Sequence, residues 1–161
     1  MERKLTHVLD DGSITMVDVS KKKDTPRKAI YEIVINLSEA TYNLLKKNSL
    51  PKGDVLNTAK VAGILAAKNT PYLIPLTHPL PLTYLDVRFY LNDQEFSVRI
   101  EAEARTTAKT GVEIEAMVAA HIAAITIYDM CKAVQKDILI SEGKLVYKSG
   151  GKSGEYISNA G

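Results

Sequence analysis

The sequence predicts an α+β fold in which helices cover one face of a mostly antiparallel sheet. Two neighbouring segments, 83–91 and 95–105, alternate apolar and polar residues with period 2, as the two strands of a hairpin do. The segment 109–136 has no proline and, after Gly111, no glycine. Its middle is apolar and its ends are charged, as expected of a buried central helix. We therefore expect one buried and one wet face of the sheet, with the long helix on the buried face.

Composition excludes several classes of protein. The 161 residues include 21 Lys and Arg against 19 Asp and Glu, and a net charge of +2 gives no strong field for nucleic acid or a membrane surface. The N-terminus lacks the apolar core of a signal peptide, and the central apolar run is too short and too polar at its ends to span a bilayer. The one cysteine, Cys131, cannot form an intrachain disulfide, and no Cys/His cluster has zinc spacing. We expect one domain, 1–161, in a cytoplasmic protein.

The chain begins with a polar segment, 1–28, that we expect to form an extended arm. Its basic run Lys21–Lys23 is interpreted as a solvated surface, the usual role of such a run. Ala29–Leu37 then alternates apolar residues with period 2, which predicts the first strand.

Two helices are predicted after this strand. Ser38 is a suitable N-cap for a short helix that ends at Lys47, and Asp54 for a second that ends near Lys68. The second helix carries a stripe of small residues at spacing i, i+4, i+8, which allows another helix to approach closely: Ala59, Gly63 and Ala67.

The segment 69–81 contains four prolines and is predicted to be a stiff loop, neither helix nor central strand. The loop presents one imidazole, His78, in a fixed position. The predicted hairpin follows it.

The central helix is predicted to begin at Thr110, which forms a capping box with Glu113, and to run for about 24 residues to Lys136. Asp137–Tyr147 is predicted to be a last strand pair or one bent strand, and 149–161 a flexible tail rich in Gly and Lys. The resulting order, β-α-β-β-α-β with an additional helix, is the ferredoxin-like arrangement.

Charged residues gather at both ends of the central helix. Asp129 and Lys132 are neighbours at i, i+3, and they form either a surface ion pair or, if burial shifts both pKa values, an acid/base couple. Capping explains Glu113, so Glu115 is the better candidate for ligand binding. His121 is interpreted as a packed or interfacial histidine.

The tail sequence KSGGKSG, Lys148–Gly154, invites comparison with a phosphate-binding P-loop. The comparison fails because Val146 stands where the motif has its first glycine, and no helix follows. Two interpretations stay open: backbone N–H groups of the glycines wrap a phosphate, or the tail is frayed.

Seven stretches in the same order, covering about Leu5 to Gly154, resemble the MoaC family of molybdenum cofactor biosynthesis: GSITMVDVS (12–20), KGDV (52–55), AGI (62–64), LIPLTHPL (73–80), KTGVEIEA (109–116), TIYDMCKAVQKD (126–137) and KSGGKSG (148–154). The resemblance implies a ferredoxin-like lyase. It implies conversion of 3′,8-cyclo-7,8-dihydroguanosine triphosphate to cyclic pyranopterin monophosphate, with release of pyrophosphate. It further implies a homohexamer, a trimer of dimers with sites at the dimer interfaces.

The resemblance also implies roles for individual residues. Asp129 and Lys132 act in proton transfer together with Lys52. A further group lines the substrate site or lies beside it: Leu76, Thr77, His78, Ile114 and Glu115, with Glu113, Arg27 and Lys148 nearby. Thr77 stands where the family usually has Cys, and Ile114 where it often has Met. No cofactor or metal is predicted, and the use of Mg²⁺ with the triphosphate stays undecided.

This chemistry suits the residues, because lysines and arginine neutralise a triphosphate and a coupled Asp–Lys pair moves protons. Glu113 and Asp129 would lie about 24 Å apart along one helix, which favours a site shared by two subunits. The stripe Ala116, Ala120 and Ala124 is then a candidate dimer seam. Two rival classes are a ligand-sensing or RNA-binding module, marked by aromatic residues on the open sheet face, and a zinc-dependent ring-opening enzyme.

Overall fold

The computed structural model describes residue 8 and residues 11–158. Its elements in chain order are β1 (Thr25–Asn36), α1 (Glu39–Lys46), α2 (Val55–Lys68), α3 (Thr70–Leu73), β2 (Leu82–Asn92), β3 (Ser97–Ala108), α4 (Glu113–Cys131), β4 (Leu139–Ser149) and β5 (Tyr156–Ile157).

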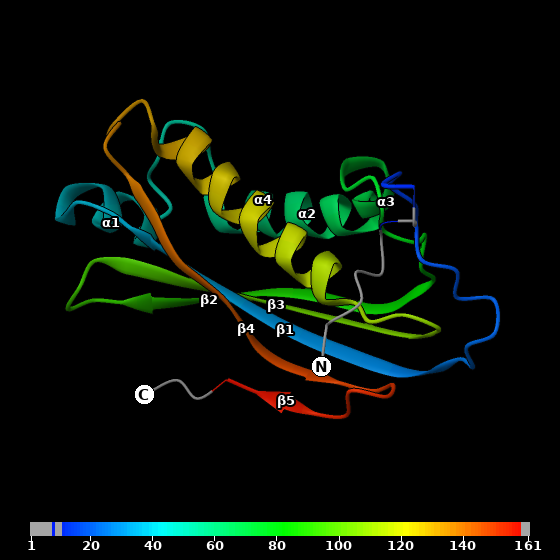
Figure 1. The fold of residues 1–161 in the computed structure, drawn as a ribbon. Helices are drawn as coiled ribbons and strands as arrows, with labels where there is room; N and C mark the ends of the chain where they lie inside the picture. The colour runs from blue at the N-terminus through cyan, green and yellow to red at the C-terminus, as the bar shows by residue number, and fades with distance from the viewer. Residues whose placement is uncertain (1–7, 9–10, 159–161) are drawn as a thin grey trace.

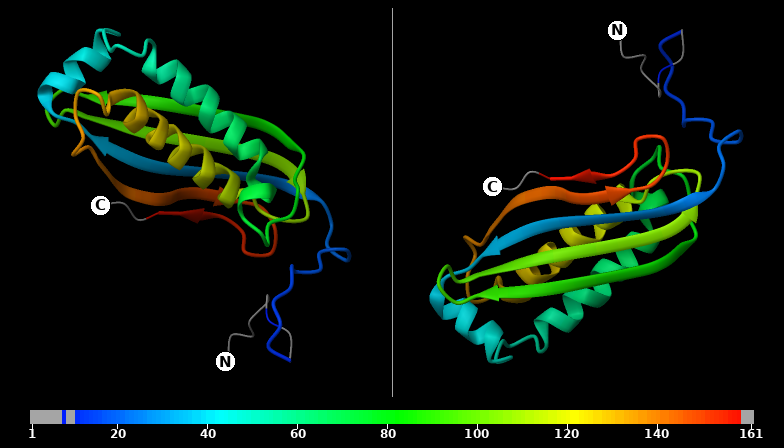
Figure 2. Two further views of the ribbon diagram at one scale, coloured as in Figure 1. Left: turned by 90° about the horizontal axis from the view of Figure 1, so that it is seen from above. Right: turned by 90° about the horizontal axis from the view of Figure 1, so that it is seen from below.

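The five strands form one sheet in the order β2-β3-β1-β4-β5, with every neighbouring pair antiparallel. The order β2-β3-β1-β4 is that of the ferredoxin-like fold, and β5 is added at the outer edge of β4. The helices lie over one face of the sheet (Figure 1), and no helix of the described residues lies on the opposite face (Figure 2, right). The predicted fold class is therefore confirmed.

The core lies between the sheet and helices α2 and α4. Because Gly63 has no Cβ, the two helices can touch: a Cβ there would lie 2.7 Å from the Ala119 backbone oxygen. The prediction that the small stripe of α2 receives another helix is confirmed. Ala116, Ala120 and Ala124 are themselves completely buried inside the chain. The prediction that they form a dimer seam is wrong, because the core of the same chain already covers them.

Two of the predicted helix caps are present and one is not. The side chain of Ser38 accepts a hydrogen bond from the Thr41 backbone N–H, and that of Asp54 from the Asn57 N–H. Helix α4, in contrast, begins at Glu113 after Val112, with no side-chain cap. The predicted capping box is wrong because the Glu113 carboxylate binds the Lys148 ammonium at 2.8 Å instead.

Helix α4 also ends earlier than predicted, at Cys131 after 19 residues. The chain turns there, with the Val134 and Gln135 N–H groups both donating to the Cys131 carbonyl. By length and composition α4 resembles a membrane span, but half of that stretch is buried inside the protein, as in the core helix of a sheet-covering layer.

Three further segments can be compared with their predictions, and two of them differ. The proline-rich loop contains the short helix α3, because Pro71 lies in its first turn, where a missing N–H costs nothing. Of the two alternatives predicted for 137–147, a strand pair or one bent strand, the structure contains the second: β4 (Leu139–Ser149) pairs irregularly with β1 near Glu142, a residue at φ 56°. The tail predicted as flexible from 149 contains β5, which pairs with Tyr147 and Lys148, and residues 159–161 lie outside the described part.

The N-terminal arm is shorter than predicted, because β1 already begins at Thr25. From the start of β1 the arm turns back toward α3 (Figure 1). Val17 and Val19 are half-buried while Asp18 and Ser20 are exposed, so the arm packs one side of its chain against the body. This packing places it beside the start of α4.

Candidate active site

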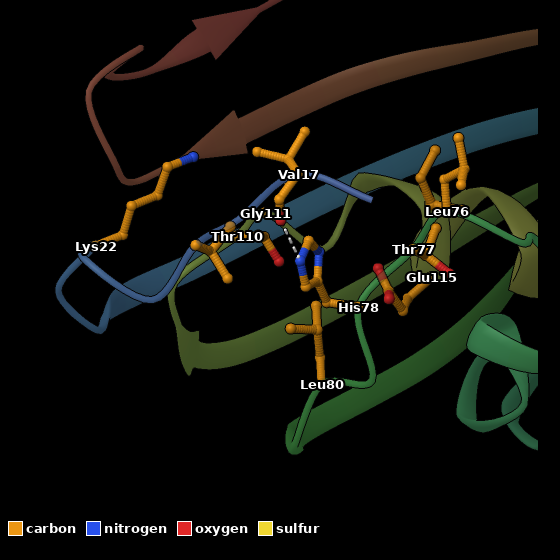
Figure 3. Close-up of a pocket in the computed structure, with 11 residues that line it drawn as sticks. Val17, Lys22, Leu76, Thr77, His78, Leu80, Thr110, Gly111 and Glu115 are labelled. Atoms are coloured by element: carbon orange, nitrogen blue, oxygen red, sulfur yellow. Dashed lines mark hydrogen bonds between the residues drawn. The ribbon is translucent and has the colours of Figure 1, made fainter. Parts of the chain in front are cut away.

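A cavity of about 280 Å³ lies where the start of α4 meets the proline-rich loop and the arm (Figure 3). Eleven residues line it: Val17, Val19, Lys22, Leu76, Thr77, His78, Leu80, Thr110, Gly111, Ile114 and Glu115. Five of them are predicted site residues from two distant parts of the sequence. The structure therefore brings Leu76, Thr77 and His78 together with Ile114 and Glu115.

The loop side of the cavity is held by its own hydrogen bonds. The Thr77 hydroxyl donates to the Ile74 carbonyl at 2.8 Å, which turns that side chain back into the loop. The His78 Nε2 lies 2.8 Å from the Val17 carbonyl, and because a carbonyl only accepts, Nε2 carries the proton (Figure 3). The imidazole therefore joins the loop to the arm.

Glu115 is the buried acid of the cavity, with only 3% of its surface exposed. Apart from its own backbone N–H, no described residue donates a hydrogen bond or pairs with its carboxyl group. Burial, reinforced by the negative charge of Glu113, raises the pKa of Glu115 to about 7. A neutral Glu115 can donate a hydrogen bond and an ionised Glu115 can only accept, so near pH 7 this residue suits either role toward a ligand.

The raised pKa of Glu115 gives a prediction for stability. Between its ordinary value of 4.5 and about 7, the folded protein binds a proton that the unfolded chain does not, so this contribution to stability falls as pH rises through that window. We expect Glu115→Gln to be more stable than the unaltered protein at pH 8, by roughly 3 kcal/mol. The difference should disappear toward pH 4.

Urea unfolding of both proteins at a series of pH values measures this difference. Glu142→Gln, at an exposed position in β4, is the matched control and should leave the pH dependence unchanged. Parallel pH profiles for Glu115→Gln and the unaltered protein would contradict the assignment.

Two cations lie beside the cavity. Lys148 pairs with Glu113, whose carboxylate lies against Gly111 in the cavity wall. Arg27 donates to the Ala108 and Lys109 carbonyls at 3.4 and 3.2 Å, and its guanidinium lies against Gly151 in the turn between β4 and β5. Gly150 and Gly151 of the KSGGKSG segment are therefore packed against Arg27, whereas Lys152, Ser153 and Gly154 are exposed.

The opposite end of α4 carries a second polar group, formed by Lys52, Asp129 and Lys132. Lys52 lies in the turn before α2, and its Nζ is 2.9 Å from Asp129 Oδ2. The Lys132 Nζ is 2.6 Å from Asp129 Oδ1. One carboxylate thus lies between two ammonium groups, all three about half exposed.

The charges of this group are fixed by pairing rather than by burial. Hydrogen bonds from Lys132 and then Lys52 lower the pKa of Asp129 to about 2, and Asp129 raises the pKa of Lys132. The alternative that burial creates an acid/base couple is therefore wrong for the chain by itself. Of the two interpretations of Asp129 and Lys132, the exposed ion pair is the one that the structure contains.

A single chain does not bring the cavity at the start of α4 together with the charged group at its end. Glu113 and Asp129 lie near opposite ends of α4, about 24 Å apart at 1.5 Å per residue. We call the cavity with Arg27, Glu113 and Lys148 the pocket half-site, and Lys52, Asp129 and Lys132 the lysine half-site. A small ligand in the first cannot touch the second within the same chain.

Neither rival class gains support. The open face of the sheet carries two partly exposed tyrosines, Tyr84 and Tyr90, the feature that would mark an RNA-binding module. The guanidinium groups of Arg105 and Arg99 already lie over these two rings, so the rings are not free to stack on a base.

On the open face of the sheet the arginines are paired with acids, such as Arg88 with Glu101 and Glu103, so this face offers little free positive charge to a nucleic acid. Within the described part of the chain, no three His, Cys, Asp or Glu side chains are grouped as metal ligands.

Six residues of the cavity were not predicted: Val17, Val19, Lys22, Leu80, Thr110 and Gly111. The arm residues were missed because a polar N-terminal segment gives no signal of where it packs. The alternation of Val17 and Val19 with polar residues is the one local indication that this segment has a buried side.

Fold and site together define a class of small α+β protein with a ferredoxin-like sheet, a cavity containing a buried acid, and separate clusters of cations suited to a phosphorylated ligand. Comparison with known proteins agrees with this class. The model of the MoaC family matches residues 16–151, and the chain belongs to the MoaC family.

Relatives similar over almost their full length carry one name, cyclic pyranopterin monophosphate synthase. The protein of Oleidesulfovibrio alaskensis is 62% identical over 156 residues, which cover 97% of this chain and 98% of the relative. That of Nitratidesulfovibrio vulgaris is 59% identical over 151 residues, 94% of each chain. That of Heliobacterium modesticaldum is 49% identical over 153 residues, 95% of this chain and 96% of the relative.

Proposed function

We propose that this chain is a lyase of molybdenum cofactor biosynthesis that converts 3′,8-cyclo-7,8-dihydroguanosine triphosphate to cyclic pyranopterin monophosphate and pyrophosphate. The observation that carries the proposal is the 62% identity to a cyclic pyranopterin monophosphate synthase over nearly the whole of both chains. The arrangement of the two half-sites supports it.

The pocket half-site binds the substrate in this proposal. Leu76 and Ile114 supply apolar surface, and Thr77, His78 and Glu115 supply polar groups at fixed positions. Arg27 and Lys148 lie close by and neutralise phosphate charge. Lys148 is already paired with Glu113, so a phosphate competes with that carboxylate for the ammonium.

The lysine half-site moves the protons. At neutral pH Asp129 is a carboxylate and its two partners are ammonium groups, so the group holds one proton acceptor between two donors. A second subunit that covers these exposed residues removes water and weakens the preference of each group for its charged form, which eases proton transfer. We therefore assign catalysis to Asp129, Lys132 and Lys52.

The distance between the two half-sites along α4 supports a site that is built from two subunits. We propose a homohexamer, a trimer of dimers, in which the pocket half-site of one chain faces the lysine half-site of its partner. Each dimer then has two equivalent sites.

The proposed reaction needs no redox cofactor. Opening and rebuilding the rings transfers protons, and attack of a hydroxyl on the α-phosphate forms the cyclic ester as the bond to pyrophosphate breaks. The nearby cations stabilise the charge that pyrophosphate gains. We place the enzyme in the cytoplasm, which keeps a thiol such as that of the free Cys131 reduced.

Incubation of the purified full-length chain with the cyclised nucleotide tests the proposal. We expect stoichiometric release of pyrophosphate and formation of a pterin, detected by its fluorescence after oxidation. A protein that binds the nucleotide and releases no pyrophosphate, even with added Mg²⁺, would contradict it.

A further inference from the structure

The N-terminal arm contributes a charged wall to the cavity. Val17, Val19 and Lys22 all line it, although they precede β1 and are far in sequence from the loop and from α4. Lys22 is the one lysine or arginine among the eleven lining residues. The cavity of the pocket half-site therefore has a cation that neither the loop nor the helix supplies.

Specific contacts hold the arm in this position. The Val17 carbonyl accepts a hydrogen bond from His78, and the Ser20 carbonyl accepts one from the Lys109 ammonium at 3.1 Å. The Lys22 N–H donates to the Val19 carbonyl at 3.0 Å, which closes a turn directly before Lys22. These contacts hold the part of the arm that directly precedes Lys22.

The Lys22 ammonium has no acidic partner among the described residues, whereas the neighbouring cation Lys148 is paired with Glu113. Figure 3 shows Lys22 at one end of the cavity and Glu115 at the other. Among the described residues no cation pairs with Glu115 either. The cavity therefore has an unpaired cation at its exposed end and an unpaired acid at its buried end.

We propose that Lys22 binds a phosphoryl group of the ligand and thereby fixes the direction in which a nucleotide lies in the cavity. The phosphates lie toward the arm, and the hydrogen-bonding edge of the base lies toward Glu115. This inference rests on the proposed function, because it takes the ligand to be a phosphorylated nucleotide. It adds to Arg27 and Lys148 a phosphate-binding residue from a segment whose basic run was interpreted as a solvated surface.

The chain supplies its own matched controls. Lys21 and Lys23 are exposed and flank Lys22, but neither lines the cavity. Replacing any of the three by Ala removes one positive charge from the same short segment. A general electrostatic effect of the arm is therefore equal for all three variants, whereas a direct contact belongs to Lys22 alone.

The test measures binding of GTP, guanosine and tripolyphosphate to the full-length protein by titration calorimetry. For Lys22→Ala we expect GTP affinity to fall roughly tenfold or more, the usual effect of removing a hydrogen bond to a charged group. Guanosine affinity should stay unchanged, and Lys21→Ala and Lys23→Ala should bind GTP as the unaltered protein does. Lys22→Arg should recover much of the loss.

Titration with tripolyphosphate distinguishes a contact to the phosphate chain itself from a contact that needs the whole nucleotide. Weaker binding of both GTP and tripolyphosphate to Lys22→Ala supports a contact to phosphate itself. An unchanged GTP affinity in Lys22→Ala would overturn the inference, as would equal losses in all three lysine variants or an equal loss for guanosine. A failure of the unaltered chain to release pyrophosphate from the cyclised nucleotide, in contrast, would count against the proposed function.

Discussion

Replacement of Asp129 or Lys132 by Ala is expected to lower the turnover number by about 10²–10⁴-fold, the usual contribution of a positioned acid or base. Both side chains are about half exposed and neither belongs to the hydrophobic core, so both variants should fold normally. Asp129→Ala also leaves Lys52 without its ion-pair partner, so its loss should be at least as large as that of Lys132→Ala. Pyrophosphate release from the cyclised nucleotide measures the effect.

A second exposed ion pair provides the control for this experiment. Lys46 pairs with Asp93 at 2.7 Å, again with both side chains largely exposed, but neither residue lines the cavity or pairs with a residue of the lysine half-site. Lys46→Ala should therefore keep normal turnover. If folded Asp129→Ala and Lys132→Ala proteins release pyrophosphate at the normal rate, the lysine half-site is only a surface ion pair and the assignment of catalysis to it is wrong.

Two inactive variants are expected to regain activity when they are combined, provided that each alters a different half-site. In a dimer of one His78→Ala chain and one Asp129→Ala chain, one site receives both changes and the other receives neither. Random pairing makes half of the dimers mixed, so about a quarter of normal activity should return. Co-expression produces this mixture, and two different affinity tags verify that both chains occur in one assembly. The pyrophosphate release of the unfractionated mixture is then measured.

The matched control combines Asp129→Ala with Lys132→Ala. Both changes fall in the lysine half-site, so in a mixed dimer every site still has one altered residue, and no activity should return. Recovery in this control, or none in the first combination, would show that the two half-sites of different chains do not form a common site.

Features that depend on neighbouring residues could be predicted from the sequence. The caps at Ser38 and Asp54 and the alternation of the hairpin are local, because each is set by residues within a few positions. The order of elements then leaves few ways to arrange the sheet. The close packing of another helix against Gly63 could also be predicted, because such a contact requires small residues at regular spacing.

Features that depend on distant residues could not be predicted in the same way. The capping box failed because Glu113 binds Lys148, 35 residues further along the chain. A capping rule considers only residues within a few positions, so it cannot show that a distant lysine will compete for the Glu113 carboxylate. The three arm residues of the cavity were missed for the same reason, since a strand-like arm gives no indication of the surface it will contact. The residue roles themselves came from the resemblance and not from patterns of charge.

The contact of Gly63 with α4 has a consequence for how this chain can change during evolution. Helix α4 both fills the core and sets the spacing and relative rotation of the two half-sites. One inserted residue in its middle would rotate Asp129 by about 100° relative to Glu113 and move it about 1.5 Å further away. It would also shift the alanines that pack against α2. Changes of length should therefore accumulate in the turn between β2 and β3, where they affect neither half-site, and be absent from α4.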